Sequence, residues 1–239
     1  MKIKRIEEFV QTNYNLIKNI GFEFVKNAVT DIDGNSYDGI RINGKLWMAS
    51  NLRTTKFNNG MDIGNFSNSK NGKLPYFETT SVHETYLNNY GLYYNAPAIE
   101  TGLLAPKGWH IPSKKEYEDL LSFVSKQSNY NLTPEENNPF SACIAKSLCS
   151  TKDWEKSYIN YSVGNKQNLN NATGFNVFPA GFLNQTGPYH IPGFDTCFWC
   201  TFNNKFFYIK ITFNDTCVKI YEADSDDRCF GFSVRCVKD

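Results

Sequence analysis

The amino-acid sequence predicts a loop-rich α+β domain over residues 31–239. Two observations predict strands: apolar residues flank an Asn43-Gly44 pair, which favours a type I′ turn, and residues 205–213 are rich in aromatic and β-branched side chains. A third predicts a helix, because apolar side chains recur at spacings of three and four in residues 113–124. Short strands, turns and one clear helix together indicate the α+β class.

The composition is that of a folded protein without a strongly charged surface. The 239 residues include 19 Phe, 14 Tyr and 4 Trp, so aromatic rings are expected to supply much of the core. The formal net charge is +1, which gives no concentrated positive charge for nucleic acid or an anionic membrane surface. No stretch is long and apolar enough to predict a membrane span.

Residues 1–30 are expected to form an N-terminal helical extension. The apolar residues recur mostly at helical spacing, and they are Ile3, Ile6, Phe9, Val10, Tyr14 and Ile17. Such a helix would pack on its own domain or, alternatively, mediate docking or oligomerisation through residues 1–20. Acidic residues stand where a secretory leader needs an apolar run, so a cytoplasmic location is expected; the alternative is export or a cell-surface location, if a natural leader is missing from this sequence.

The remaining elements follow from local signals. Residues 58–72 are rich in Asn, Gly and Ser and predict a surface loop. Ser113 and Glu116 have the spacing of a capping box at the start of the predicted helix. Residues 139–150 predict a second short helix. No repeat and no Gly/Ser-rich linker divides residues 31–239, which favours one domain.

Six sequence blocks, in order, carry a resemblance to a known family. They are Asp31-Ile-Asp-Gly-Asn-Ser-Tyr37, Leu46-Trp-Met-Ala-Ser-Asn-Leu-Arg-Thr-Thr55, Gly91-Leu-Tyr-Tyr-Asn95, Pro106-Lys-Gly-Trp-His-Ile-Pro112, Gly174-Phe-Asn-Val-Phe-Pro-Ala-Gly181 and Gly231-Phe-Ser-Val-Arg-Cys-Val237. Together they resemble the Fibrobacter succinogenes major paralogous domain, a bacterial family of paralogues, over essentially residues 31–239.

The resemblance implies a C-type-lectin-like fold, which is also that of formylglycine-generating enzymes. It would comprise a mostly antiparallel twisted sheet, two helices and long irregular loops that carry ligand contacts. Carbohydrate binding and adhesion are among the roles that such a fold implies. The sequence departs from the family at residues 197–200, where Cys-Phe-Trp-Cys replaces a Trp pair followed by Ser, and in its lack of the leader typical of relatives.

The cysteines raise the alternative of thiol chemistry. There are seven, which cannot all pair within one chain, and they are Cys143, Cys149, Cys197, Cys200, Cys217, Cys229 and Cys236. Residues 197–200 form a Cys-x-x-Cys, but their flanks predict a strand or loop and not the helix N-terminus that activates such motifs. Resemblance to formylglycine-generating enzymes suggests a thiol-dependent oxidoreductase as an alternative, with Cys229 and Cys236 in the relevant region. Reduced, buried thiols remain the favoured interpretation.

No sequence motif predicts a specific cofactor. The three histidines, His83, His110 and His190, lie far apart and in no spaced ligand pattern. Residues 31–35 resemble the start of a calcium loop but lack its later ligands, so they favour a turn. A second acidic cluster supplies weak calcium candidates, namely Asp224, Asp226 and Asp227.

The leading hypothesis is a non-catalytic recognition module that binds a glycan or protein ligand through the surface of residues 181–231. Aromatic rings and short polar side chains together favour recognition. The candidate ligand-binding residues are Tyr189, His190, Phe194, Asp195, Phe202, Asn203, Asn204 and Tyr221. A further alternative is a structural or assembly subunit of a surface or fibre complex.

Overall fold

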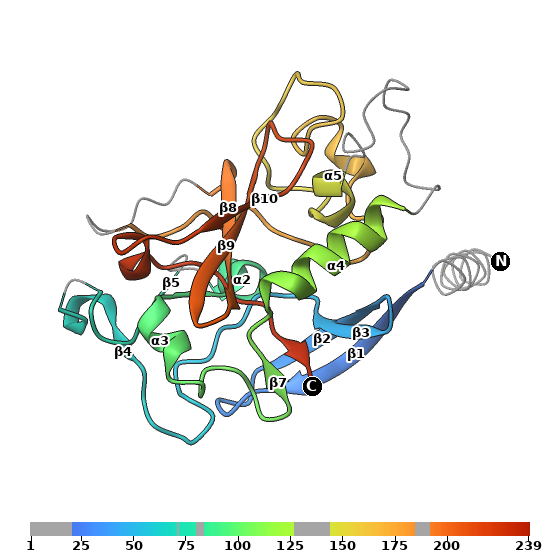
Figure 1. Cartoon of the computed structure of the whole chain (residues 1–239). Helices are drawn as coiled ribbons and strands as arrows, with labels where there is room; N and C mark the ends of the chain where they lie inside the picture. The colour runs from blue at the N-terminus through green and yellow to red at the C-terminus, as the bar shows by residue number, and fades with distance from the viewer. Residues whose placement is uncertain (1–20, 71, 80–83, 127–143, 185–191) are drawn as a thin grey trace.

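The computed structural model describes residues 21–70, 72–79, 84–126, 144–184 and 192–239, which form a mixed α+β structure with mostly antiparallel sheets (Figure 1). The strands are β1 Phe22–Thr30, β2 Ser36–Ile42, β3 Lys45–Met48, β4 Gly64–Asn65, β5 Tyr76–Thr79, β6 Leu92–Tyr94, β7 Trp109–His110, β8 Asp195–Phe202, β9 Lys205–Thr212, β10 Lys219–Glu222 and β11 Val237–Lys238. The helices are α2 Glu84–Tyr90, α3 Ala96–Glu100, α4 Lys114–Ser125 and α5 Ile144–Leu148, with 3-10 turns η1 Phe66–Asn68, η3 Gln167–Leu169 and η4 Asp227–Cys229.

The main sheet has five strands in the order β1-β2-β3-β11-β7. Its β2–β3 hairpin confirms the predicted turn, because Asn43 and Gly44 both have positive φ angles, 49° and 81°, as a type I′ turn requires. The register pairs Ile42 with Lys45 and Ile40 with Trp47, so Ile40 and Ile42 lie buried on the core side.

Strand β1 corrects the expected boundary of the domain. Residues 22–30 were expected to belong to a helical extension, but they pair with β2 along the edge of the main sheet, and Phe22 is completely buried. The packed structure therefore begins no later than Phe22, and not at Asp31. The helix expected within residues 2–20 lies outside the described residues.

Two three-stranded sheets complete the described β-structure. Strands β10, β9 and β8 form one antiparallel sheet, in which β9 confirms the strand predicted at residues 205–213. Strands β4, β5 and β6 form the other, and its β4–β5 pair is parallel. Residues 58–72 thus contain β4 and η1 as well as loop, so the expected surface loop is only partly correct.

Helix α4 confirms the predicted capping box. The Ser113 side chain accepts a hydrogen bond from the Glu116 backbone N–H, and the Glu116 carboxylate accepts one from the Ser113 N–H. Helix α5 confirms the second short helix over part of its length, since residues 127–143 are not described. The expectation of two helices is wrong, since the described residues contain four. The two that were not expected, α2 and α3, are too short to leave a periodic signal in the sequence. None of the described helices combines the length and hydropathy that a membrane crossing needs.

The C-terminal segment, residues 231–238, joins all three sheets. Phe232 exchanges backbone hydrogen bonds with Tyr94 of β6, while Ser233 bonds to Cys197 and Trp199 of β8. Val237 then pairs with the main sheet in β11. Most of this segment is buried, so its backbone hydrogen bonds connect the three sheets inside the molecule.

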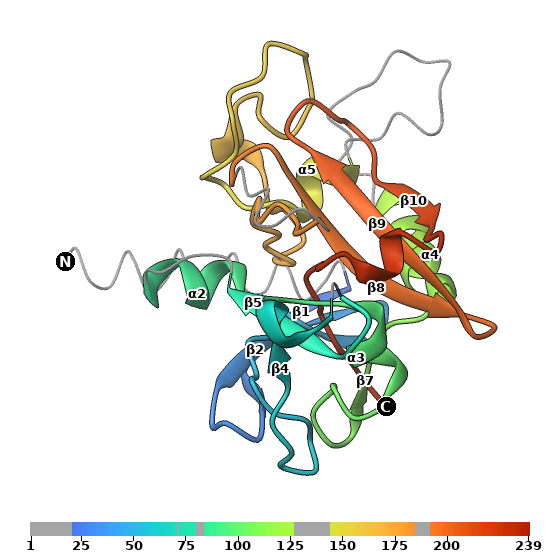
Figure 2. The ribbon, with the colours of Figure 1, turned by 90° about the vertical axis from the view of Figure 1, so that its left-hand side faces the viewer.

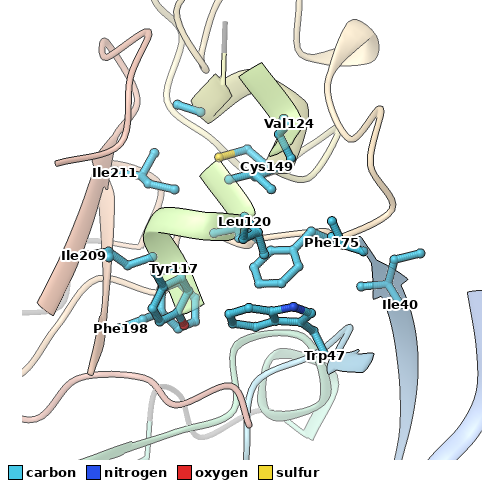
Figure 3. Packing of buried hydrophobic residues seen from close by; sticks show 14 of the residues in the cluster. Ile40, Trp47, Tyr117, Leu120, Val124, Cys149, Phe175, Phe198, Ile209 and Ile211 are labelled. Carbon is cyan, nitrogen blue, oxygen red and sulfur yellow. The ribbon is translucent and has the colours of Figure 1, made fainter. Parts of the chain in front are cut away.

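The principal core lies between the main sheet, α4 and the β8–β9 strands, as Figure 3 shows in close-up. Within this core the ring of Trp47 packs 5.1 Å from Tyr117 of α4 and 5.7 Å edge-on from Phe175, measured between ring centroids. Leu120 and Val124 confirm the predicted buried face of α4, with Leu121 only partly buried against the same core. Trp47 and Phe175, which belong to two different sequence blocks, therefore pack against each other in the core.

Candidate ligand-binding site

The β8–β9 hairpin presents three of the predicted ligand-binding residues together. Its two-residue turn is Asn203-Asn204, with φ angles of 49° and 59°, which is the left-handed pair of a type I′ turn. Asparagine tolerates this conformation better than most residues. The turn leaves the ring of Phe202, the last residue of β8, 45% exposed. In Figure 2 the turn projects from the body of the molecule.

A hollow of about 530 Å³ lies at this hairpin tip, and we call it the hairpin hollow. One wall is Phe202, Asn203 and Asn204, and the other is Ile99 and Glu100 at the end of α3. The remaining lining residues are Ser113, Thr201, Lys205 and Phe206. An exposed ring, two amides, a cation and a carboxylate thus converge on one concavity of the size of a ligand site.

Ion pairs at the margin of the hairpin hollow hold its charged side chains. Lys205 Nζ lies 2.6 Å from a Glu222 carboxylate oxygen, across β9 and β10. Arg228 donates to Glu100, and its guanidinium lies 4.8 Å from the centroid of the Phe206 ring. These pairs are largely exposed, so they orient the groups and contribute little to stability.

Three other predicted ligand-binding residues, Phe194, Asp195 and Tyr221, do not join this group. Asp195 is the first residue of β8, seven residues from Phe202, or roughly 23 Å along an extended strand, and Phe194 directly precedes it. Asp195 forms an ion pair with Lys210 at 3.2 Å, and burial raises its pKa despite that cation. Tyr221 lies on β10, where its ring stacks on Tyr208 at 5.3 Å between centroids. Tyr189 and His190 lie outside the described residues.

The acidic residues after β10 form hydrogen bonds with one another. One Asp224 carboxylate oxygen accepts hydrogen bonds from the backbone N–H groups of Asp226 and Asp227, at 2.8 and 2.9 Å. The carboxylate of Asp227 in turn accepts a hydrogen bond from the backbone N–H of Asp224. Burial raises the pKa of Asp227, as do the neighbouring carboxylates. Across the described ranges no three metal-ligating side chains are grouped to bind an ion.

Residues 31–35 form the expected turn, and its carboxylates are occupied by protein donors. Asp31 accepts from the N–H groups of Asp33 and Asn35 and from the Tyr37 hydroxyl. Asp33 accepts from the N–H and hydroxyl of Thr55 at 2.6 and 2.9 Å. Burial acts to raise the pKa of Asp33, but the hydrogen bonds outweigh it and hold that pKa below its ordinary value. The oxygens that calcium would need are thus engaged.

The Cys-x-x-Cys lies in the middle of β8. Because side chains alternate along a strand, Cys197 and Cys200 point to opposite faces, and they belong to different core clusters. Both thiols are buried, and burial raises the pKa of Cys197 well above its ordinary value and that of Cys200 to about 12. Neither thiol has the depressed pKa of a reactive cysteine.

A buried arginine, which was not among the predicted site residues, connects distant parts of the chain. Arg235 is completely buried; its Nε donates to Asn51 Oδ1 at 2.8 Å, and its terminal nitrogens donate to the carbonyl oxygens of Phe175 and Asn176. Burial lowers its pKa to about 10, so the guanidinium stays charged at neutral pH. Three sequence blocks therefore meet at one buried cation.

Comparison with known proteins shows the family of the chain. No curated protein and no solved structure matches the chain significantly. A family model described as the Fibrobacter succinogenes major domain matches residues 40–238, which is most of the chain. The protein therefore belongs to the Fibrobacter succinogenes major domain family.

Proposed function

We propose that this chain is a non-catalytic recognition module that binds a glycan or a protein segment in the hairpin hollow. Its fold would be a variant of the C-type-lectin-like arrangement, with the β8–β10 sheet and its connecting segments as the ligand-facing part. Carbohydrate binding and adhesion would then be the roles to test first.

One observation carries the proposal: an exposed ring lies beside two amides at the rim of a hollow. Burying the exposed part of Phe202 against a ligand would release apolar surface from water at little entropic cost, because a phenyl ring has few rotamers. Asn203 and Asn204 each offer an amide donor and acceptor for hydroxyl or peptide groups. The ring supplies affinity and the amides supply orientation.

The thiol-dependent alternative receives less support from the geometry. An oxidoreductase of the formylglycine-generating type needs reactive thiols, whereas Cys197, Cys200 and Cys236 are buried with raised pKa values. Cys217 and Cys229 are partly exposed. We expect a maleimide at neutral pH to label these two at least tenfold faster than Cys197 or Cys200 in the native chain. Rapid labelling of Cys197 or Cys200 instead would revive the thiol route.

An exposed apolar loop gives the assembly alternative one observation of its own. Tyr158, Ile159 and Tyr161 are 84%, 52% and 42% exposed. If this loop joins copies of the chain, light scattering will show a mass that rises with concentration, and Tyr158→Ser will suppress the rise. A constant monomer mass removes that alternative for self-assembly.

The direct test of the proposed function uses two matched phenylalanines of β8 and its flank. The chain, Phe202→Ala and Phe194→Ala are applied to one array of immobilised glycans and peptides. The two rings are similarly exposed, 45% and 40%, but only Phe202 lines the hairpin hollow. We expect Phe202→Ala to weaken binding at least tenfold, about 1.4 kcal/mol, and Phe194→Ala to retain it. The reverse pattern would remove the hairpin hollow as the site.

A further inference from the structure

A second hollow, of about 500 Å³, shares no lining residue with the first. We call it the polar hollow, because most of its lining side chains are polar: besides Ser36 and Ser50, they are Asn27, Asp38, Arg53, Asn88, Asn171 and Asn176. They come from β1, β2, α2 and two loops, so segments far apart in the sequence build one concavity. The ring of Phe24, 47% exposed, stands at its margin.

A β-bulge fixes one wall of the polar hollow. Val25 pairs with Gly39 and Val29 with Tyr37, so three residues of β1 lie opposite Asp38 alone. At the centre of this bulge Asn27 adopts a left-handed conformation, with φ of 48°. Its N–H donates to Asp38 Oδ1 at 2.8 Å. The bulge thereby holds Asn27 next to the carboxylate of Asp38.

The opposite wall is held by the buried arginine. Asn176 donates its N–H to Asn171 Oδ1 at 2.8 Å, and the Asn171 amide donates back to the Asn176 side chain at 3.3 Å. The carbonyl of Asn176 accepts from Arg235 at 2.9 Å. These two amides therefore sit on a backbone that a fully buried guanidinium fixes, which is the preorganisation that favours binding.

Arg53 completes the polar hollow and balances its charge. Its guanidinium lies 4.6 Å from the centroid of the Tyr37 ring and donates to the Ser36 carbonyl at 3.2 Å. Among the described lining residues Asp38 and Arg53 are the charged pair, so the hollow carries no net charge. Because the two opposite charges offset each other, neither an anion nor a cation gains net attraction from the lining.

We propose that the polar hollow binds a neutral saccharide. A sugar hydroxyl both donates and accepts hydrogen bonds, so it matches a lining of amides, one carboxylate and one guanidinium. The apolar face of a pyranose ring suits the exposed face of Phe24 at the margin. This site is additional to the hairpin hollow and stands without it.

The test titrates the full chain by calorimetry with cellopentaose, xylopentaose, mannopentaose and chitopentaose, with trigalacturonate as the anionic comparison. We expect at least one neutral pentasaccharide to bind saturably. Phe24→Ala and Asn88→Ala should each weaken it at least tenfold; Asn88 is an exposed residue of α2, so its replacement leaves the core intact. Phe202→Ala, which alters only the hairpin hollow, should leave this affinity unchanged.

Three outcomes would overturn the proposal. One is that none of the four neutral sugars binds saturably. Another is tighter binding of trigalacturonate than of every neutral sugar, which would contradict the charge argument. The third is binding that survives Phe24→Ala and Asn88→Ala and disappears in Phe202→Ala, which would assign the sugar to the hairpin hollow and so support the proposed function alone.

Discussion

The hairpin hollow and the polar hollow differ in the backbone structure that holds their lining side chains in place. The first displays Phe202 and its neighbours on a two-residue turn, with exposed ion pairs at the margin. The second is built on a β-bulge and on a loop that Arg235 holds from the core. The ring and the amides of the hairpin hollow depend on a local turn, with α3 as the facing wall, whereas the polar hollow depends throughout on contacts between distant segments. Core substitutions should therefore disturb the polar hollow and spare the hairpin hollow.

The largest effect is expected from Arg235→Met. It leaves the Asn51 side-chain oxygen and the carbonyls of Phe175 and Asn176 without their buried donor, so the free energy of unfolding should fall by about 3 kcal/mol or more. Urea denaturation measures the change. Arg41→Met is the matched control, since Arg41 pairs with Glu23 at the surface and should cost at most about 1 kcal/mol. Equal losses in the two variants would refute the central role of Arg235.

A smaller effect is expected from Asp31→Ala. Tyr37 donates to Asp31 and accepts from the Arg53 N–H at 3.0 Å, so the turn helps to place a residue of the polar hollow. Removing the carboxylate should lower the free energy of unfolding by about 2 kcal/mol. The exposed Asp62→Ala should change it by no more than about 0.5 kcal/mol. Saccharide binding should weaken in the first variant only, and unaltered binding would separate the turn from the hollow.

The dependence of stability on pH tests the start of α4, next to the hairpin hollow. Hydrogen bonding to Glu116, and to Asp239, raises the pKa of His110 despite its burial. Burial acts to raise the pKa of Glu116, but bonds from His110, Lys45 and Ser113 hold it well below its ordinary value. The His110 contribution is complete below pH about 6.5 and is lost as pH rises through the higher folded pKa; that of Glu116 is present above pH about 4.3 and is lost on acidification.

These opposite signs predict that both contributions are present between about pH 4.5 and 6.5. Because His110 is 40% exposed at its side chain, its effect should be at most about 1 kcal/mol after screening. Denaturation at pH 5.5 and 8.5 should show that the advantage of the unaltered chain over His110→Gln shrinks at the higher pH. An advantage that grows with pH would reverse the assigned sign.

The smallest effect on stability is expected from Asn204→Gly. Glycine adopts the positive φ of this turn position without strain, so the free energy of unfolding should change by less than about 0.5 kcal/mol. The substitution nevertheless removes one amide from the hairpin hollow. Array binding should weaken while thermal denaturation stays almost unchanged; if binding also stays unchanged, Asn204 serves the turn alone.

Local features were predictable from the sequence because their causes are local. The Asn43-Gly44 turn and the Ser113 capping box each depend on residues within four positions, and both are confirmed. Strand β1 was missed because residues 22–30 were grouped with the N-terminal extension, although the predicted helix itself ended at Ile20. Within the candidate site, proximity in sequence was misleading: Phe194 and Phe202 were grouped, yet the extended strand β8 separates them.

The polar hollow and Arg235 could not be predicted in this way. Arg235 bonds to Asn51, 184 residues away, and to the carbonyls of residues 59 and 60 positions away. Nothing within a short window distinguishes this arginine from a surface one. The ordered blocks containing Asn51, Asn176 and Arg235 were the only signal, and they indicated a family and not a contact.

Hydrogen–deuterium exchange of the full chain tests the comparison between the two hollows most directly. A glycan or peptide selected on the array should slow exchange at residues 202–205, and a neutral pentasaccharide should slow it at residues 24–27 and 171–176. Those separate footprints are the predicted result. Protection of one and the same segment by both ligands, or of segments that line neither hollow, would contradict the account.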